Sequence, residues 1–291
     1  MNAEPDINGS VGTIYDYQAY VQRRDVISES HAQSYDSADS YAAVFLILLW
    51  EYYDQYRDAG ILDANKEKID QLVDLLLSLQ TGGYTETIQG SGIKYLMDNA
   101  EVYCGLQCAF RLYDTLWAEE NRTQMIADAV SLFQYDFECI WWSGEYYYCV
   151  LNGNNQPYFG EEMDWEKLYE FAVPQLFPVI FAIETPEDEK SRQVYSRFCQ
   201  QWNWTTMEYD DQTWSLIVYA AAIMEDYDSV DKFLETGIMN FVFMGMPKLE
   251  NAFCIKISVP LPFSLRINHS SQQTQWGARH YKCLFLVLLS L

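Results

Sequence analysis

Residues 35–50, YDSADSYAAVFLILLW, begin with two aspartates and continue almost without polar side chains. Asp36 and Asp39 are three residues apart, so in a helix their carboxylates share one face at the N-terminal end, where the helix dipole favours anions. A helix that is apolar on all sides must be buried on all sides. The segment therefore predicts an inner helix of a larger α-helical assembly, with two aspartates at the edge of its core.

Helix capping is the simpler interpretation of these two aspartates. An Asp at the N-cap with an acid three residues later resembles a capping box, and capping requires no catalytic role. The sequence favours something more than capping because the same arrangement, an acid before an apolar helix, occurs again along the chain.

Composition predicts a soluble globular protein, since 49% of the 291 residues are hydrophobic and 21% are charged. We expect no membrane span, because there is no run of 18 apolar residues, and no signal peptide, which makes the cytoplasm the default location. A net charge of -24 argues against a nucleic-acid partner and suits a neutral or cationic ligand. The sequence leaves the oligomeric state open.

Few residues are available for metal or nucleophilic chemistry. The seven cysteines are scattered, and although Cys104 and Cys108 could supply half of a metal site, this spacing more often marks two small buried residues. With only three histidines, Ser-His-Asp and Cys-His catalysis are poor candidates. We therefore expect no metal and no cofactor, and we expect any catalysis to depend on carboxylates.

Pairs of an apolar helix and an amphipathic partner recur along the chain. The expected pairs are about 38–58 with 65–81, 93–117 with 121–137, 164–183 with 186–204, and 210–222 with 229–243. Gly60 is expected to end the first helix, and Pro174 and Pro178 imply a kink in the third pair. Before the first pair, residues 13–24 read as a strand-like entry into a short helix, and 25–34 as a polar connection. Aromatic runs on either side of Ser143-Gly144 predict one small β-hairpin insertion.

Four aspartates open the expected inner helices: Asp39, Asp98, Asp164 and Asp211. Their spacing is typical of helical hairpins in a closed or solenoidal array. The inner helices of such an array are parallel, so we expect their acidic N-termini to converge on one basin.

Several segments resemble those of bacterial six-hairpin glycosidase-like proteins: 12–17 (GTIYDY), 35–43 (YDSADSYAA), 95–103 (YLMDNAEVY) and 175–178 (QLFP). The resemblance covers about residues 12–245. It implies an all-α fold of the (α/α)6-toroid type, distantly like family 8 glycoside hydrolases, and a carbohydrate-active enzyme. Only four hairpins are visible, so the array is expected to be incomplete at its N-terminus. Residues 252–291 differ from the catalytic-type domain 1–251, since they contain four basic residues and no acid.

The predicted function is hydrolysis of an oligo- or polysaccharide by carboxylate acid/base catalysis. The candidate catalytic residues are Asp39, Asp98 and Glu101, with the general acid assigned to Asp39 or Glu101, because apolar surroundings raise a carboxyl pKa. Hydrogen bonding and stacking to the sugar are assigned to Tyr35, Asp36, Tyr41, Tyr95, Asn99, Tyr103, Trp141, Trp142 and Gln175. For Trp141 and Trp142, a place in a buried aromatic hairpin is expected equally.

Two other functions remain open on the sequence alone. The first is a non-catalytic carbohydrate-binding or scaffold protein with the same helical basin. The second is a terpene-synthase-like enzyme in which Asp210 and Asp211 bind Mg²⁺, although basic residues to hold a diphosphate are few.

Overall fold

The computed structural model describes residues 4–22, 25–135, 137–158, 162–206 and 215–237. The chain divides into two compact units, which are treated separately here: unit 1 comprises Met1–Tyr20 and Ser28–Phe198, and unit 2 comprises Val21–Ile27 and Cys199–Leu291. The predicted domain boundary before residue 252 lies outside the described residues.

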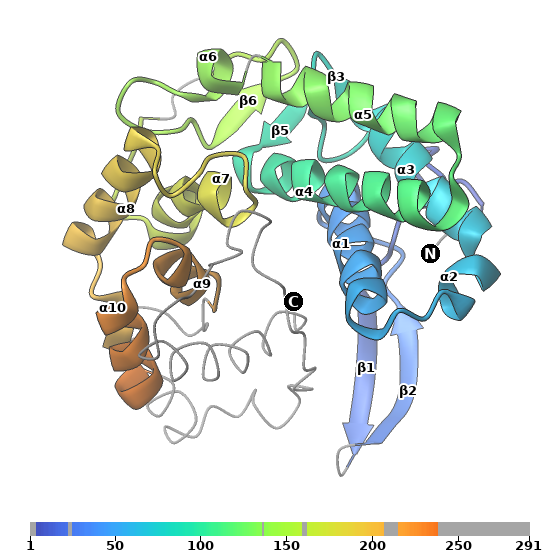
Figure 1. Cartoon of the computed structure of the whole chain (residues 1–291), viewed down its shortest axis with the longest axis horizontal. Helices are drawn as coiled ribbons and strands as arrows, with labels where there is room; N and C mark the ends of the chain where they lie inside the picture. Colours follow the sequence, from blue (N-terminus) through green and yellow to red (C-terminus); the bar gives the residue numbers. More distant parts are fainter. Residues whose placement is uncertain (1–3, 23–24, 136, 159–161, 207–214, 238–291) are drawn as a thin grey trace, which may run out of the picture. The chain divides into compact units, whose positions relative to one another are not determined.

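The secondary structure is mostly helical, in agreement with the coarse prediction (Figure 1). The α-helices are α1 (Ala38–Tyr56), α2 (Gly60–Ala64), α3 (Lys66–Leu79), α4 (Leu96–Leu112), α5 (Glu120–Tyr135), α6 (Phe137–Trp141), α7 (Phe177–Ile180), α8 (Glu189–Gln201), α9 (Ser215–Ile223) and α10 (Tyr227–Lys232). Single π or 3₁₀ turns form η1 (Tyr113–Trp117), η2 (Leu168–Ala172), η3 (Val173–Leu176), η4 (Trp204–Thr206) and η5 (Phe233–Gly237). The strands are β1 (Tyr17–Gln22), β2 (Asp25–His31), β3 (Gln80–Thr81), β4 (Tyr84–Thr85), β5 (Ile93–Tyr95) and β6 (Val150–Asn152).

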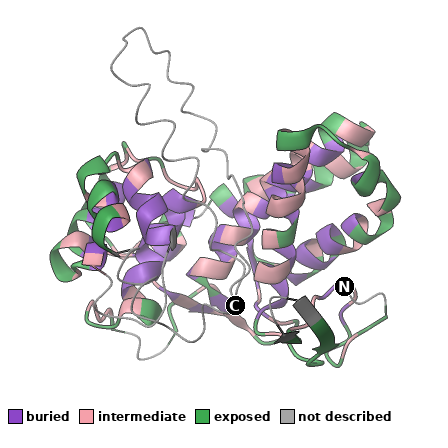
Figure 2. Cartoon of the chain, turned by 90° about the horizontal axis from the view of Figure 1, so that it is seen from below, coloured by how far each residue is buried: buried purple, intermediate pink, exposed green. Residues whose placement is uncertain are grey.

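The core of unit 1 is built around α4, which packs against both α1 and α5, while α1 also packs against α3 (Figure 1). Buried and exposed residues fall on different sides of the outer helices (Figure 2). The predicted inward stripe of α3 is confirmed, since all of its members are buried: Ile69, Leu72, Val73, Leu75, Leu76 and Leu79. A helix with one buried apolar stripe and an opposite polar face is the expected pattern at the surface of a helical protein.

Helices α1 and α4 run parallel and touch at their backbones. Residue pairs that advance together along the two helices are in contact: Ser37 with Asp98, Ser40 with Glu101, and Ala43 with Gly105. A Cβ atom at Gly105 would lie 2.7 Å from Ala43 Cα and 2.8 Å from its carbonyl oxygen. Only glycine permits so close an approach, and the approach brings the two N-terminal ends together.

The ends of α1 differ from the prediction. Its N-cap is Ser37, whose hydroxyl accepts a hydrogen bond from Ser40 N, and not Asp36. The helix ends because Arg57 adopts a left-handed conformation with φ 54° and bonds back to Tyr53 O. The predicted stop at Gly60 is therefore wrong, and Gly60 instead begins α2.

Three two-stranded sheets replace the single predicted hairpin, all short: β1 with β2, β3 with β4, and β5 with β6. The short helix and polar connection predicted for 13–34 are strands β1 and β2. The turn at Ser143-Gly144 exists, but one bridge between Trp142 and Tyr147 closes it, and Trp141 belongs to α6. At 93–95 the chain is strand β5, so the helix predicted from residue 93 begins at Leu96.

The first helix of the third predicted pair, expected over 164–183, does not form as one continuous helix. Pro174 and Pro178 fall where a long helix was expected, and the chain forms η2, η3 and the four-residue α7 in succession. Proline removes a backbone donor and clashes with the preceding turn, so the segment is divided into short pieces.

Lys94 on β5 joins two loops of unit 1. Its side chain is completely buried, and its Nζ donates to Thr81 O at 2.5 Å and to Asn155 Oδ1 at 2.6 Å. Asn155 in turn donates to Gly82 O at 2.8 Å. The loop after β6 is thereby fastened to the turn between β3 and β4.

Unit 2 contains α9, α10 and the turns η4 and η5 among its described residues. In α9, residues 216–221 and Ile223 are buried, and the helix packs against α10. Trp204 of η4 lies against Phe233 of η5 with ring centroids 6.1 Å apart. No helix in the described ranges combines the length and apolar character that a membrane crossing requires.

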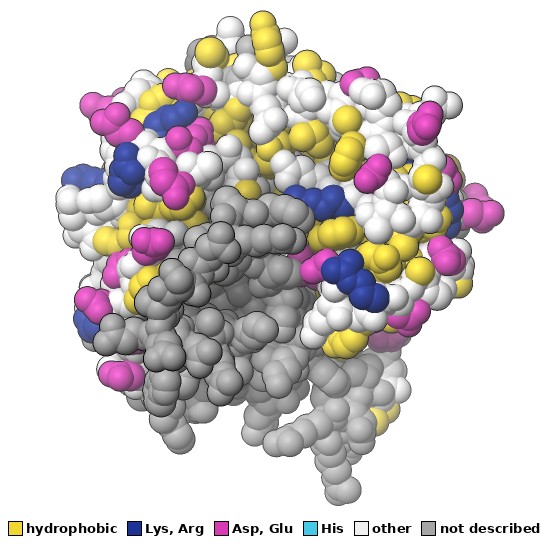
Figure 3. Space-filling view, viewed as in Figure 1, with side chains coloured by type: hydrophobic (Ala, Val, Ile, Leu, Met, Phe, Trp, Pro, Cys, Tyr) yellow, Lys and Arg dark blue, Asp and Glu magenta, His cyan; other side chains and the backbone are white. Residues whose placement is uncertain are grey.

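On the face seen in Figure 3, Asp and Glu side chains lie dispersed over the described surface, with fewer Lys and Arg among them. One basic residue bridges elements of unit 1: Lys66 Nζ pairs with Asp70 at 3.1 Å and with Glu119 at 2.9 Å. Exposed pairs of this kind contribute little stability, so the fold depends on its packed helices.

Replacing Gly105 by Ala is expected to destabilise unit 1 by about 1–3 kcal/mol, because the new methyl group has no room against the Ala43 backbone. The sign of the change in unfolding free energy is informative, since Gly→Ala inside a helix otherwise increases stability by about 1 kcal/mol. Urea unfolding followed by circular dichroism measures the change. The matched control is Gly60→Ala, where the nearest atom is a movable Asp58 carboxylate oxygen at 3.2 Å, and we expect a change within about 0.5 kcal/mol. A stabilised Gly105→Ala protein would contradict the close helix contact.

Candidate active site

The parallel N-terminal ends of α1 and α4 bring Asp39, Asp98 and Glu101 together; these three residues are named the carboxyl cluster. Asp39 is the buried member, with no exposed surface. Its Oδ1 accepts hydrogen bonds from Ser37 Oγ at 2.6 Å and from Ser40 N at 2.9 Å. Its Oδ2 accepts one from Thr85 Oγ1 at 2.6 Å. Both carboxyl oxygens of Asp39 are therefore occupied by the protein.

Asp98 shares the hydroxyl of Ser37 with Asp39. Its Oδ2 lies 3.0 Å from Ser37 Oγ and accepts a hydrogen bond from Thr87 Oγ1 at 2.6 Å. Within the described part of the chain, Asp98 Oδ1 has no hydrogen bond, and the residue is half-buried.

The Ser37 hydroxyl has one proton and stands between two carboxyl groups. It can donate to only one of them at a time, so the other interaction is favourable only when that carboxyl carries a proton of its own. Two carboxyls held around one hydroxyl therefore favour a state in which they retain a proton.

The pKa values of the cluster follow this geometry. Burial raises the pKa of Asp98 to about 8, with the charge of Asp39 adding to the rise and the Thr87 and Ser37 hydroxyls opposing it. Burial also raises the pKa of Asp39, against the hydrogen bonds from Ser37 and Thr85. At Glu101, burial and the Asp98 charge raise the pKa well above its ordinary range, while the hydrogen bond from Ser40 Oγ to Oε2 lowers it.

The two threonines come from a segment that crosses both helix ends. Residues 85–87 follow the tight Gly82-Gly83 turn, and Thr87 O accepts from Ala38 N at 2.8 Å. Asn99 fixes this segment: its Oδ1 accepts from Thr85 N at 2.8 Å and its Nδ2 donates to Thr85 O at 3.1 Å. Asn99 therefore acts as a strand partner for Thr85, and its predicted contact with a ligand is corrected to a structural role.

Tyr169 of η2 lies near the accessible side of the cluster. Tyr169 is 48% exposed, and the charges of Asp36, Asp98 and Glu101 add to the rise in its pKa that partial burial causes. Asp36 is exposed, just before the N-cap of α1. The half-buried Asp98 and Glu101 thus have an exposed acid and an exposed phenol as neighbours.

The predicted tyrosines Tyr35 and Tyr41 fasten the N-terminal segment of unit 1. Tyr35 OH donates to Asp6 Oδ2 at 2.6 Å, and Tyr41 OH donates to Asp16 Oδ1 at 2.8 Å. Burial and the acceptor carboxylate raise the pKa of each phenol to about 12. Both rings are only half-buried, so they keep surface for a ligand. Tyr95, at the N-cap of α4, is 40% exposed.

Three other predicted ligand contacts lie in the core. Trp141 has no exposed surface, and Tyr103 packs against Phe133 and bonds to Gln134. Gln175 is also fully buried: its Oε1 accepts from Tyr147 N and its Nε2 donates to Tyr147 O. The surfaces and polar atoms of these three side chains are thus used inside the protein, and their contact with a ligand stays a prediction. Trp142 is half-buried beside Tyr147.

Of the four aspartates expected to converge, Asp39 and Asp98 lie together, on either side of the Ser37 hydroxyl. Asp164 accepts a hydrogen bond from Glu166 N at 3.0 Å in a turn before η2. Asp210 and Asp211 lie outside the described residues, as does the Mg²⁺ site suggested for them. No group of three or more His, Cys, Asp or Glu side chains in the described ranges is arranged to hold a metal ion.

Sequence reasoning missed the hydroxyl groups that organise the cluster: Ser37, Ser40, Thr85 and Thr87. Their partners are up to 61 residues away, so no local pattern reveals them. A weak signal existed in the alternation of Thr85 and Thr87, which places both side chains on one side of an extended segment.

No protein-family model matches the sequence, and the comparison with curated proteins gives no match.

The raised pKa of Asp98 predicts a pH-dependent stability. A carboxyl whose pKa is about 8 when folded and 3.8 when unfolded binds more protons in the native state across that interval, so its contribution is complete below pH 3.8 and is lost as the pH rises through 8. The stability advantage of the wild type over Asp98→Asn is therefore expected to fall between pH 5 and pH 8.5. Urea unfolding of both proteins at each pH measures it.

The matched control is Asp58→Asn in the same unit. Hydrogen bonds from Gly60 N and the Tyr52 hydroxyl lower the pKa of Asp58, so this residue is ionised throughout the same interval and its difference from wild type should stay constant. A difference for Asp98→Asn that also stays constant would show that Asp98 is ionised at neutral pH.

Proposed function

We propose that unit 1 is a glycoside hydrolase domain that cleaves an oligo- or polysaccharide with the carboxyl cluster. The observation that carries this proposal is the pair of half-buried carboxyls, Asp98 and Glu101, beside a fully buried third one. Glycosidic hydrolysis needs one carboxyl that is protonated at neutral pH and a second that is ionised. The family resemblance of segments 35–43 and 95–103 supports the same chemistry at the same residues.

In this proposal Asp98 is the general acid. Its pKa of about 8 keeps it protonated at neutral pH, and we assign its Oδ1, which has no hydrogen bond to the described residues, to the leaving oxygen. The proton passes to the glycosidic oxygen as its bond to the anomeric carbon breaks, and a water molecule supplies the new oxygen on that carbon, either directly or after Glu101 has attacked it. Glu101 is the second carboxyl, and the reaction requires its ionised form. A protonated Asp98 removes one cause of the raised pKa of Glu101, whereas burial, the larger cause, still opposes its ionisation.

Asp39 is a positioning residue in this proposal and not a catalytic one. It is fully buried and cannot touch a substrate. Its charge contributes to the high pKa of Asp98, and its hydrogen bonds fix Ser37 and Thr85. The proposal therefore assigns the general acid to Asp98 in place of Asp39.

The helical pairs of unit 1 fit a part of an (α/α)6 toroid. The parallel inner helices α1 and α4, each followed by an outer helix, α3 or α5, are the repeating unit that such a ring requires. The proposal of a toroid rests on these two pairs and on the resemblance.

A second candidate is a non-catalytic carbohydrate-binding or scaffold protein. The observation that favours it is the dense hydrogen bonding around Asp39, which also serves as a lock between α1 and α4. Under this alternative the exposed rings of Tyr169 and Tyr95 would hold a sugar without cleaving it.

The proposal predicts different losses for the two catalytic variants. Each of Asp98→Asn and Glu101→Gln should lower hydrolysis of an unactivated oligosaccharide by about 100-fold or more. With a nitrophenyl glycoside, whose leaving group needs no proton, Asp98→Asn should keep most of its activity and Glu101→Gln should not. Product release from a panel of α- and β-linked substrates measures both effects.

The control is Glu51→Gln, because Glu51 is another buried carboxyl of α1, with its pKa raised to about 8, near the opposite end of the helix. Its variant should hydrolyse at the wild-type rate. Equal losses in Glu51→Gln and Asp98→Asn would point to a general effect on folding. A wild-type protein that binds a sugar but cleaves none of the panel would favour the binding alternative.

A further inference from the structure

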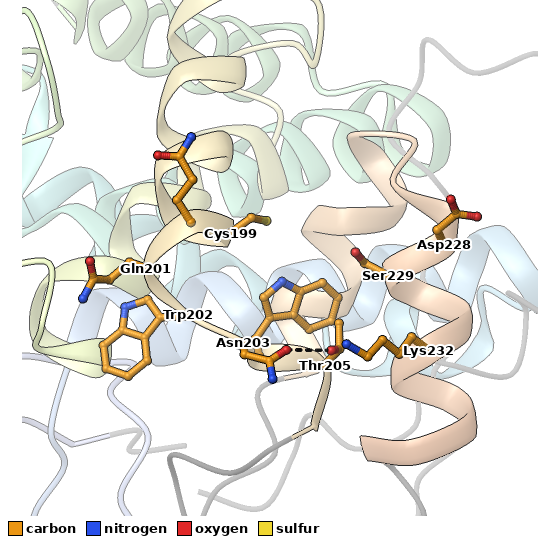
Figure 4. A pocket seen from close by; sticks show the side chains of 10 residues that line it. Cys199, Gln201, Trp202, Asn203, Thr205, Asp228, Ser229 and Lys232 are labelled. Carbon is orange, nitrogen blue, oxygen red and sulfur yellow. Dashed lines mark hydrogen bonds between the residues drawn. The ribbon is translucent and has the colours of Figure 1, made fainter.

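Unit 2 contains a pocket separate from the carboxyl cluster. The loop after α8 and the helix α10 line it, with a volume of about 470 Å³ (Figure 4). Sites for small molecules usually measure about 300–1,000 Å³, so the pocket holds one or two sugar rings.

Aromatic side chains give the pocket an apolar wall. Trp204 is only 6% exposed and is held by Phe233, so it forms a fixed wall. Trp202 is half-buried and stands at the margin of the pocket (Figure 4). An indole that keeps part of its surface exposed can stack on the apolar face of a pyranose.

Polar groups from both elements complete the lining. Asn203 is exposed, and its Oδ1 accepts from Thr205 Oγ1 at 3.2 Å, which orients the amide. Lys232 reaches from α10 toward Thr205 (Figure 4), and Asp228 lies one turn earlier on the same helix. Among the described lining residues, Lys232 carries the one positive charge and Asp228 the one negative charge, and this balance suits a neutral ligand rich in hydroxyl groups.

We propose that this pocket is a non-catalytic binding site for a neutral oligosaccharide. Its described lining residues include one carboxyl, Asp228, whereas glycosidic hydrolysis uses two, so we assign the pocket a binding role. Trp202 supplies stacking, while Asn203, Asp228 and Lys232 supply hydrogen bonds to hydroxyls. The inference rests on the proposed function only for the choice of sugars as ligands.

The test uses the full chain with Asp98→Asn, so that no substrate is consumed. Tryptophan fluorescence and calorimetry are followed during titration with neutral gluco-, galacto-, manno- and xylo-oligosaccharides. At least one of them should bind with saturation, and Trp202→Ala should weaken that binding by roughly tenfold or more. Lys232→Ala and Asn203→Ala should weaken it by smaller factors.

The control Trp117→Phe removes an indole of unit 1, where Trp117 Nε1 bonds to Asp63, and should leave the calorimetric affinity unchanged. Saturable binding that Trp202→Ala leaves intact would overturn the proposal, as would no binding of any neutral sugar. Preference for uronic-acid oligomers over neutral ones would also overturn it, in favour of Lys232 binding an anion. Trp202-dependent binding by a wild type that hydrolyses nothing would keep this inference and reject the hydrolase.

Discussion

The hydroxyl of Ser37 takes part in both the capping of α1 and the contact between α1 and α4. It caps α1 and lies within hydrogen-bond distance of both Asp39 on α1 and Asp98 on α4. This position exists only because Gly105 lets α4 approach the backbone of α1. A packing feature in the middle of the helices thus determines the electrostatics at their ends, since burial at a close contact is what keeps protons on the carboxyls.

The cluster combines opposing influences on its charge. Burial and mutual repulsion favour protonated carboxyls, whereas the hydroxyls of Thr85, Thr87 and Ser40 favour ionised ones. Burial is the largest influence at each of the three carboxyls, so all three pKa values rise. Hydroxyl groups suit such a site because they can donate to a carboxylate or accept from a carboxylic acid without moving.

The sequence allowed the helical parts of this site to be predicted, because hydrophobic periodicity is a local property. It placed the start of α1 at residue 38, identified the stripe of α3, and selected Asp39 and Asp98 as neighbours. It did not place Gln175 and Trp141 in the core, where the structure has them, since residue type alone does not tell a ligand-binding amide or indole from one used in packing. It also assigned the capping position to Asp36, where Ser37 occupies it, because several adjacent polar residues are all good caps.

The buried ammonium of Lys94 connects the loop around Asn155 to the cluster. Asn155 holds both Lys94 and the Gly82 carbonyl, and the chain that leaves that turn carries Thr85 to Asp39. The exposed loop 152–157 has the appearance of a permissive site for inserting a tag or a foreign peptide. It is instead a remote support of the carboxyls, and an insertion there would disturb the hydroxyl groups that set their charge.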